Sequence, residues 1–291
     1  MAKTIEFGTP VLDELRLCYL AEPSLLQDLR HLTARTSRKI AEYILFRVDG
    51  DRFEFFFIVY LDANGSRTEL GSIKFGRYGA AESPYVYYKI QNEVLYDRQL
   101  LDQALHFPDL LGLYFNNFTA IDIAMDHKKN YSTIIRRMMR NEKVTTILNG
   151  RAIKDRKQLI KGVTFDYSSS LSRLHCPTIT IRQAKAARNK SKGITVQSYD
   201  KKAEIDAESG KNYIMNQYGN PQHLFRLEVR LGYQNLQNYF RRLGQPQTLE
   251  ALFDPKILAD MFYDNLSSVL RFTNGRKLLS WLEILACNGR I

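Results

Sequence analysis

The stretch Thr119-Ala-Ile-Asp-Ile-Ala-Met-Asp126 predicts a β-strand with one apolar and one polar face. Residues two apart share a face of a strand, so Asp122, Ala124 and Asp126 point the same way. Two acids on one face repel each other unless a cation lies between them. A divalent metal ion or basic side chains would supply this positive charge. The alternative is that Asp122 pairs with a nearby arginine and Asp126 caps the next helix.

A second strand is predicted at Leu224–Leu231, where apolar and charged residues alternate again. Arg226, Glu228 and Arg230 share its polar face. A carboxylate between two guanidinium groups is typical of a charged functional site. A cross-strand ion pair on a solvated sheet face is the alternative.

A third strand is predicted at Ile194–Lys201, with Tyr199 and Lys201 on the same face as Thr195 and Gln197. A tyrosine hydroxyl can act as a nucleophile toward phosphate, and a neighbouring ammonium can neutralise the charge that develops. A purely structural tyrosine is the alternative, since the chain has 17 tyrosines.

Outward from these strands, the pattern predicts further strands and a hairpin with its turn at Asn64-Gly65. Helical spacing predicts helices at Tyr131–Asn141 and Tyr233–Leu243, and a helical set over Leu249–Leu285 with stops at Pro255 and Asn274-Gly275. The expected fold class is α+β: a central, mostly antiparallel sheet carrying the active site, flanked by helices, with a helical C-terminal segment.

Three segments are expected along the chain. Residues 1–116 form an α+β segment that packs on or extends the sheet, and residues 117–245 form a nuclease-like core with the carboxylate and tyrosine strands. Residues 246–291 form the helical C-terminal segment.

Composition excludes several classes of protein. With 44% hydrophobic and 25% charged residues over 291 positions, the chain matches a globular protein. It has no apolar run long enough for a transmembrane helix, and Met1–Glu6 lacks the apolar region of a secretory signal. Cys18, Cys176 and Cys287 are too widely spaced to suggest a disulfide framework or a zinc site. We therefore expect a cytoplasmic protein without membrane partners.

Positive charge is concentrated in one quarter of the chain. Lys128–Lys202 holds 19 basic and 4 acidic residues, a net of +15, whereas the whole chain has a net of +11. Such segregation is typical of a protein that binds a phosphate backbone. A merely solvated basic surface and, less well supported, an anionic membrane surface are the alternatives. The basic residues expected to contact DNA are Arg136, Arg137, Arg140, Lys185, Arg188, Lys190, Lys192, Lys202, Arg226 and Arg230.

Several familiar motifs are absent from the sequence. None of the five histidines forms a His-x-His or His-x-x-x-His pair, so the two-histidine metal motif of many tyrosine nicking enzymes is missing. The chain has no P-loop, which argues against an ATP-driven motor, and no Gly-x-Ser-x-Gly elbow.

The three strands together resemble the replication initiation factor family. The pieces are Ile121-Asp-Ile-Ala-Met-Asp126, Val196-Gln-Ser-Tyr-Asp-Lys201 and Phe225-Arg-Leu-Glu-Val-Arg-Leu231, in that order. The family includes rolling-circle initiators of plasmids and filamentous phages and the relaxases of some conjugative elements, and it is similar in lacking the two-histidine motif. The resemblance covers roughly residues 117–243.

The resemblance implies a sequence-specific DNA nickase that forms a 5′-phosphotyrosyl link. It assigns Tyr199 as the nucleophile, Lys201 and Arg226 as phosphate contacts, and Asp122, Asp126 and Glu228 as ligands of Mg²⁺ or Mn²⁺. Ile181-Arg-Gln-Ala-Lys185 stands where relatives often carry a glycine-serine turn, so the alternative nucleophiles are Tyr167, Tyr213 and Tyr218.

The expected partner is plasmid or phage origin DNA, with a host helicase and a second copy of the chain as further candidates. A relaxase with the same chemistry and a DNA-binding regulator without chemistry are the alternatives. A third is an RNA-binding protein that stacks bases on Tyr85, Tyr87 and Phe225.

Overall fold

The computed structural model describes residues 5–48, 55–63, 65–76, 83–153, 163–166, 178–183 and 193–290, and for Leu26, Arg30 and residues 163–166 it describes the backbone alone. The chain divides into two compact units, a smaller one (Asp13–Ile121) and a larger one (Met1–Leu12 with Asp122–Ile291). Of the helices in these described ranges, none has the length and apolarity that a bilayer crossing needs.

The smaller unit is an antiparallel sheet with two α-helices. In sheet order its strands are β1 (Pro10–Leu20), of which the part from Asp13 belongs to this unit, and then the meander β6 (Tyr85–Ile90), β5 (Ser66–Phe75), β4 (Phe55–Ala63), β3 (Tyr43–Val48) and β2 (Ser37–Ile40). Its helices are α1 (Pro23–Arg30), the 3-10 turn η1 (Asn92–Tyr96) and α2 (Arg98–Leu110). Aromatic side chains fill its core: Phe57 meets Phe75 edge to face, and Phe107 of α2 packs on Tyr43.

Gly65 and Gly71 shape the β4–β5 hairpin. Gly65 takes a φ of +79° at the predicted turn. Gly71 takes a φ of +156° beside a register shift at Val59/Tyr60, and a Cβ there would lie 2.3 Å from the Lys89 carbonyl oxygen. The neighbouring strand therefore requires a glycine at this bulge.

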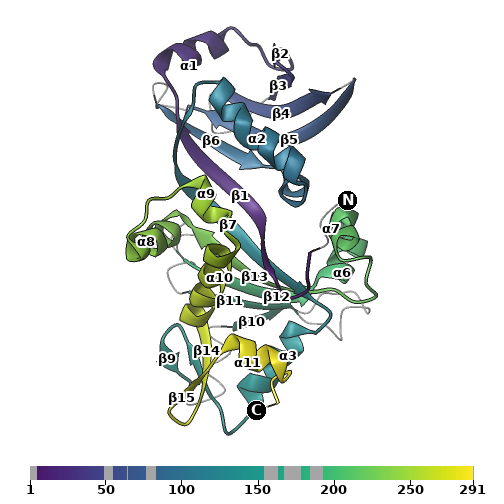
Figure 1. Ribbon diagram of the computed structural model, residues 1–291, viewed down its shortest axis with the longest axis vertical. Helices are drawn as coiled ribbons and strands as arrows, with labels where there is room; N and C mark the ends of the chain where they lie inside the picture. Colours follow the sequence, from purple (N-terminus) through teal and green to yellow (C-terminus); the bar gives the residue numbers. More distant parts are fainter. Residues whose placement is uncertain are drawn as a thin grey trace. The chain divides into compact units, whose positions relative to one another are not determined.

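The larger unit is built on a sheet that contains the three strands singled out from the sequence (Figure 1). In sheet order its strands are β10 (Val163–Asp166), β11 (Thr178–Arg182), β12 (Thr195–Asp200), β13 (Phe225–Gly232) and β7 (Tyr114–His127), of which the part from Asp122 belongs to this unit. The β10–β11, β11–β12 and β12–β13 pairs are antiparallel.

Helices accompany this sheet, and the longer ones have one apolar, buried side. They are α3 (Tyr131–Arg140), α6 (Lys201–Glu204), the π-helical turn η3 (Ile205–Ser209), α7 (Asn212–Gln217), α8 (Tyr233–Leu243), α9 (Leu249–Leu252), α10 (Pro255–Val269) and α11 (Trp281–Ala286). In α3 the apolar side is Ile134, Ile135, Met138 and Met139, all buried. The predicted α+β class with a mostly antiparallel sheet and flanking helices is confirmed.

One detail of the prediction is wrong: the C-terminal segment is not helical throughout. Leu270–Asn274 (β14) and Lys277–Leu279 (β15) form a hairpin in a second sheet of order β15-β14-β8-β9, with β8 at Thr145–Leu148 and β9 at Arg151–Ala152. Asn274-Gly275, predicted as a helix stop, starts a tight hairpin turn in which Gly275 has a φ of +59°. The division into residues 1–116, 117–245 and 246–291 stays a prediction.

Candidate active site

Three neighbouring strands bring the predicted site residues to one face of the larger unit's sheet. In the β12–β13 register, Tyr199 lies opposite Arg226 and Gln197 opposite Glu228. β7 is the next strand after β13. We call the side of these strands that carries Tyr199, Glu228, Arg230 and Asp122 the tyrosine face.

Tyr199 is held by Glu228. Its hydroxyl donates a hydrogen bond to Oε2 of Glu228 across 2.9 Å. The tyrosine is partly exposed, whereas the Glu228 side chain is only 1% exposed. The hydroxyl therefore sits at the edge of solvent with a fixed carboxylate beside it, an arrangement in which a nucleophile has a proton acceptor within reach.

Arg230 joins the two carboxylates of this face. Its Nε lies 2.6 Å from Oε1 of Glu228 and 3.2 Å from Oδ2 of Asp122. The Arg230 side chain remains 51% exposed, whereas that of Asp122 is 12% exposed. Partial burial would lower the pKa of Arg230, but the charges of Glu228 and Asp122 and the hydrogen bond to Glu228 raise it well above its ordinary value. A permanent positive charge thus faces solvent near Tyr199.

Arg226 and Asp126 form a different kind of pair, entirely inside the protein. Arg226 donates from Nε to Oδ1 of Asp126 at 2.7 Å and from Nη2 to Oδ2 at 2.6 Å, and both side chains are 0% exposed. This bidentate pair occupies both oxygens of Asp126. The expected phosphate contact by Arg226 and metal ligation by Asp126 do not fit this arrangement, because neither group reaches solvent.

Lys201 lies beside the tyrosine but not on its strand. β12 ends at Asp200, whose side chain accepts from the Ala203 amide and starts α6, so Lys201 is the first residue of that helix. Its Nζ donates to Glu204 at 2.7 Å and stands 5.8 Å from the centre of the Tyr199 ring. The Lys201 ammonium is buried, so its direct contact with phosphate is not available in this arrangement.

The three carboxylates predicted as metal ligands are not gathered into one group in the described structure. Within the described ranges, no group of three His, Cys, Asp or Glu residues is placed to hold a metal ion. Asp122 and Glu228 both form ion pairs with Arg230, whereas Asp126 pairs with Arg226. A three-carboxylate site made of Asp122, Asp126 and Glu228 therefore does not fit this arrangement.

Two of the three alternative tyrosines lie in the described part of the chain. Tyr218 is buried and stacks on Phe7 with ring centres 5.1 Å apart. Tyr213 belongs to α7 and not to a strand of the tyrosine face, and Tyr167 lies outside the described residues. Of the tyrosines the sequence proposed, Tyr199 alone among the described ones joins the charged strands.

The predicted DNA-binding residues that the structure describes lie on different elements. Arg136, Arg137 and Arg140 lie on α3, and Lys202 pairs with Asp206 at 2.9 Å. Lys185, Arg188, Lys190 and Lys192 lie outside the described residues.

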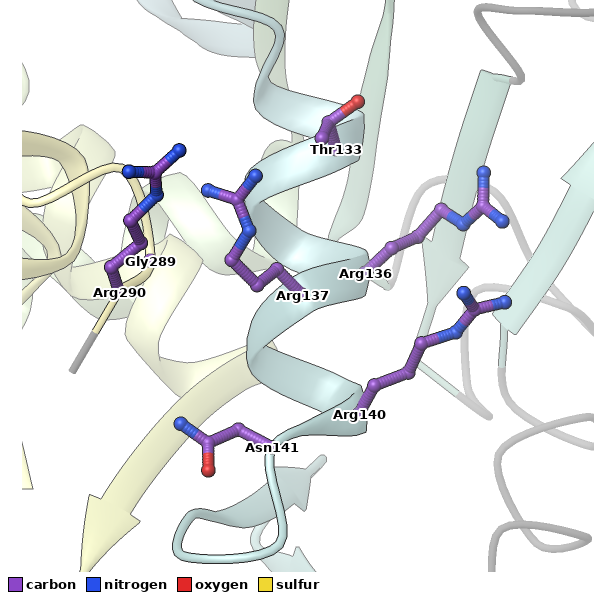
Figure 2. Close-up of a pocket in the computed structure, with 7 residues that line it drawn as sticks. All are labelled: Thr133, Arg136, Arg137, Arg140, Asn141, Gly289 and Arg290. Carbon is purple, nitrogen blue, oxygen red and sulfur yellow. The ribbon is translucent and has the colours of Figure 1, made fainter.

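The three α3 arginines share a cavity of about 590 Å³ with four other residues (Figure 2). We call this the arginine pocket; it is lined by Thr133, Arg136, Arg137, Arg140, Asn141, Gly289 and Arg290. Sequence reasoning missed Arg290, because only the packing of the C-terminal turn brings it to α3. It also missed Glu204 as the partner of Lys201, although their spacing of three residues along a helix could have indicated it.

Comparison with solved structures finds a likeness in fold. The structure is similar to that of a rolling circle replication initiator protein from Geobacillus stearothermophilus, with a TM-score of 0.52 and 13% sequence identity, over 97% of this chain and 95% of that chain. No protein-family model matches the sequence, and no curated protein matches it. The likeness shows a shared fold and agrees, at that level, with the resemblance found in the strand motifs.

Proposed function

We propose that this protein initiates rolling-circle replication by nicking one strand of an origin DNA through Tyr199. The observation that carries the proposal is the Tyr199–Glu228 hydrogen bond of 2.9 Å on a partly exposed, arginine-bearing sheet face. The fold shared with a replication initiator and the net charge of +11 support a DNA substrate. A DNA substrate agrees with the cytoplasmic location that the sequence predicts.

The chemistry follows from the contacts of Tyr199. Its oxygen attacks the scissile phosphorus, the bond from phosphorus to the 3′ oxygen breaks, and a 5′-phosphotyrosyl link forms. The tyrosine proton passes to Glu228, which already accepts its hydrogen bond, and the departing 3′ oxygen takes a proton from water. The reverse attack by a 3′ hydroxyl rejoins the strand.

Arg230 supplies positive charge where the phosphate would lie. Its guanidinium is half exposed and fixed by Glu228 and Asp122, and an arginine side chain is effectively always charged. A fixed cation aimed at a phosphoryl group stabilises the charge that builds up in the transition state. In this arrangement Asp122 positions Arg230, a role different from the metal ligation that the sequence predicts.

The need for Mg²⁺ or Mn²⁺ is a separate part of the proposal. A divalent ion between Asp122 and Glu228 would have to displace Arg230 from both carboxylates. Nicking assays with each metal and with EDTA decide whether this exchange occurs.

The decisive experiment uses supercoiled plasmid carrying the protein's cognate origin, located as the DNA that the protein protects in a footprint. We expect a covalent protein–DNA adduct on a denaturing gel, lost in Tyr199→Phe and retained in Tyr213→Phe, the matched control on α7. Adduct formation by Tyr199→Phe would overturn the nucleophile assignment.

A DNA-binding regulator without chemistry is the second candidate, favoured by one observation: Asp122, Asp126 and Glu228 all take part in ion pairs. Binding of the origin without nick or adduct, with either metal, would support it. A relaxase of a mobile element would use the same chemistry, so the Tyr199 test covers it as well; a helicase partner and a homodimer stay predictions.

A further inference from the structure

The arginine pocket gathers four guanidinium groups from two distant parts of the chain. Arg136, Arg137 and Arg140 come from α3, and Arg290 follows the last helix, α11. Figure 2 shows Arg136 and Arg140 extending to one side of α3, and Arg137 and Arg290 lying on the other. Among the residues that line the cavity in the described structure, none is acidic.

Close packing holds the C-terminal turn against α3. Gly289 has a φ of +67°, and a Cβ there would lie 3.2 Å from the Ile134 carbonyl oxygen. Its amide donates to the Ile284 carbonyl at 2.8 Å, and Arg137 donates to the carbonyl of Asn288. Arg290 is therefore brought to α3 by fixed backbone contacts, which makes the pocket a built feature of the fold.

The pocket lies on the side of the sheet away from Tyr199. Ser132 of α3 donates to the carbonyl oxygen of Ser198 at 3.1 Å, and the two serine hydroxyls are 2.9 Å apart. Ser198 precedes Tyr199 on β12, so their side chains point to opposite faces. The pocket and the tyrosine face are thus two separate surfaces attached to one strand.

We propose that the arginine pocket binds the phosphodiester backbone of origin DNA outside the nick site, as a second contact surface. The inference rests on the proposed function for its choice of DNA. Its guanidinium groups lie on both sides of α3, so a compact anion would meet only some of them, whereas a backbone with repeated phosphates can engage both sides. Arg136 and Arg140 are one turn apart, about 6 Å along the helix axis.

Arginine suits this task because its planar, always charged fork matches phosphate oxygens. Contacts of this kind hold and orient DNA without reading its sequence. A second contact surface would keep the origin DNA bound after the strand at Tyr199 has been nicked.

The test compares two variants with the same loss of charge. The pocket variant is Arg136→Gln/Arg140→Gln/Arg290→Gln; Arg137 is left in place because it holds the turn. The control variant is Arg241→Gln/Arg271→Gln/Arg276→Gln, three exposed arginines of the same unit outside the pocket. Circular dichroism and thermal unfolding check that both variants fold.

The measurement is the salt dependence of binding to a duplex that extends on both sides of the nick site, and to one of its strands alone. Each lost phosphate contact lowers the slope of log affinity against log salt by about 0.9 on duplex and about 0.7 on single strands. We expect the pocket variant to lose about 2 to 3 from the slope and the control to keep the wild-type slope; the larger loss identifies the DNA form that the pocket holds.

Equal slopes for the pocket variant, the control and the wild type would overturn the inference. Adduct formation by the wild-type protein, measured in parallel, reports on the proposed function separately. An adduct with unchanged slopes would contradict DNA binding by the arginine pocket but not the nicking. A reduced slope without any adduct would contradict the nicking but not DNA binding by the pocket.

Discussion

Arg226 and Arg230 lie four residues apart on the same face of β13, and each pairs with an aspartate of β7, yet the two pairs differ in burial and in use. The side chains of Arg226 and Asp126 are 0% exposed and are joined by two hydrogen bonds. The Arg230 side chain is 51% exposed and pairs with both Asp122 and Glu228. The same residue types therefore form a structural pair inside the protein and a charged site at its surface. Burial, not residue type, separates the two roles.

The largest effect on stability is expected from breaking the inner pair. Asp126→Asn keeps the volume but leaves the charge of Arg226 buried without its carboxylate, so the free energy of unfolding should fall by about 3–5 kcal/mol. Urea denaturation measures this loss. Replacing both partners together, Asp126→Leu with Arg226→Met, should cost less than Asp126→Asn, because no buried charge remains.

A smaller effect, on rate, is expected at the proton acceptor. Glu228→Gln keeps a group that can accept the hydrogen bond of Tyr199 but cannot take its proton, so covalent capture should slow by about 10²-fold, or about 2.7 kcal/mol. The rate of adduct formation with excess origin DNA measures it. Glu250→Gln, an exposed glutamate of α9, is the matched control. A rate equal to that of the control would exclude Glu228 as the acceptor.

The smallest effect is expected at the outer pair. Asp122→Asn should change the free energy of unfolding by only about 0–1 kcal/mol, because Arg230 is half exposed and keeps Glu228. The same urea series measures it beside Asp126→Asn. Equal losses in the two variants would contradict the contrast between an inner and an outer pair.

Local pattern was enough to predict the three strands of the tyrosine face and the helices α3 and α8. Helical spacing predicted a helix at Tyr233–Leu243, and α8 has these bounds. The β14–β15 hairpin was missed, because short strands at Leu270–Asn274 and Lys277–Leu279 form only by pairing with each other and with β8. A turn signal such as Asn274-Gly275 ends either a helix or a strand, and the partner strand decides which.

By itself, the sequence determined which side chains share a face, because the period of a strand is two and needs no partner. It therefore placed Asp122 with Asp126, and Arg226 with Glu228 and Arg230, on faces that could meet. Only the tertiary structure decided that Asp126 takes Arg226 and Asp122 takes Arg230, because the alignment of β7 with β13 joins residues about a hundred positions apart. Burial depth, equally a property of the packed chain, then made one arginine an internal support and left the other facing solvent beside Tyr199.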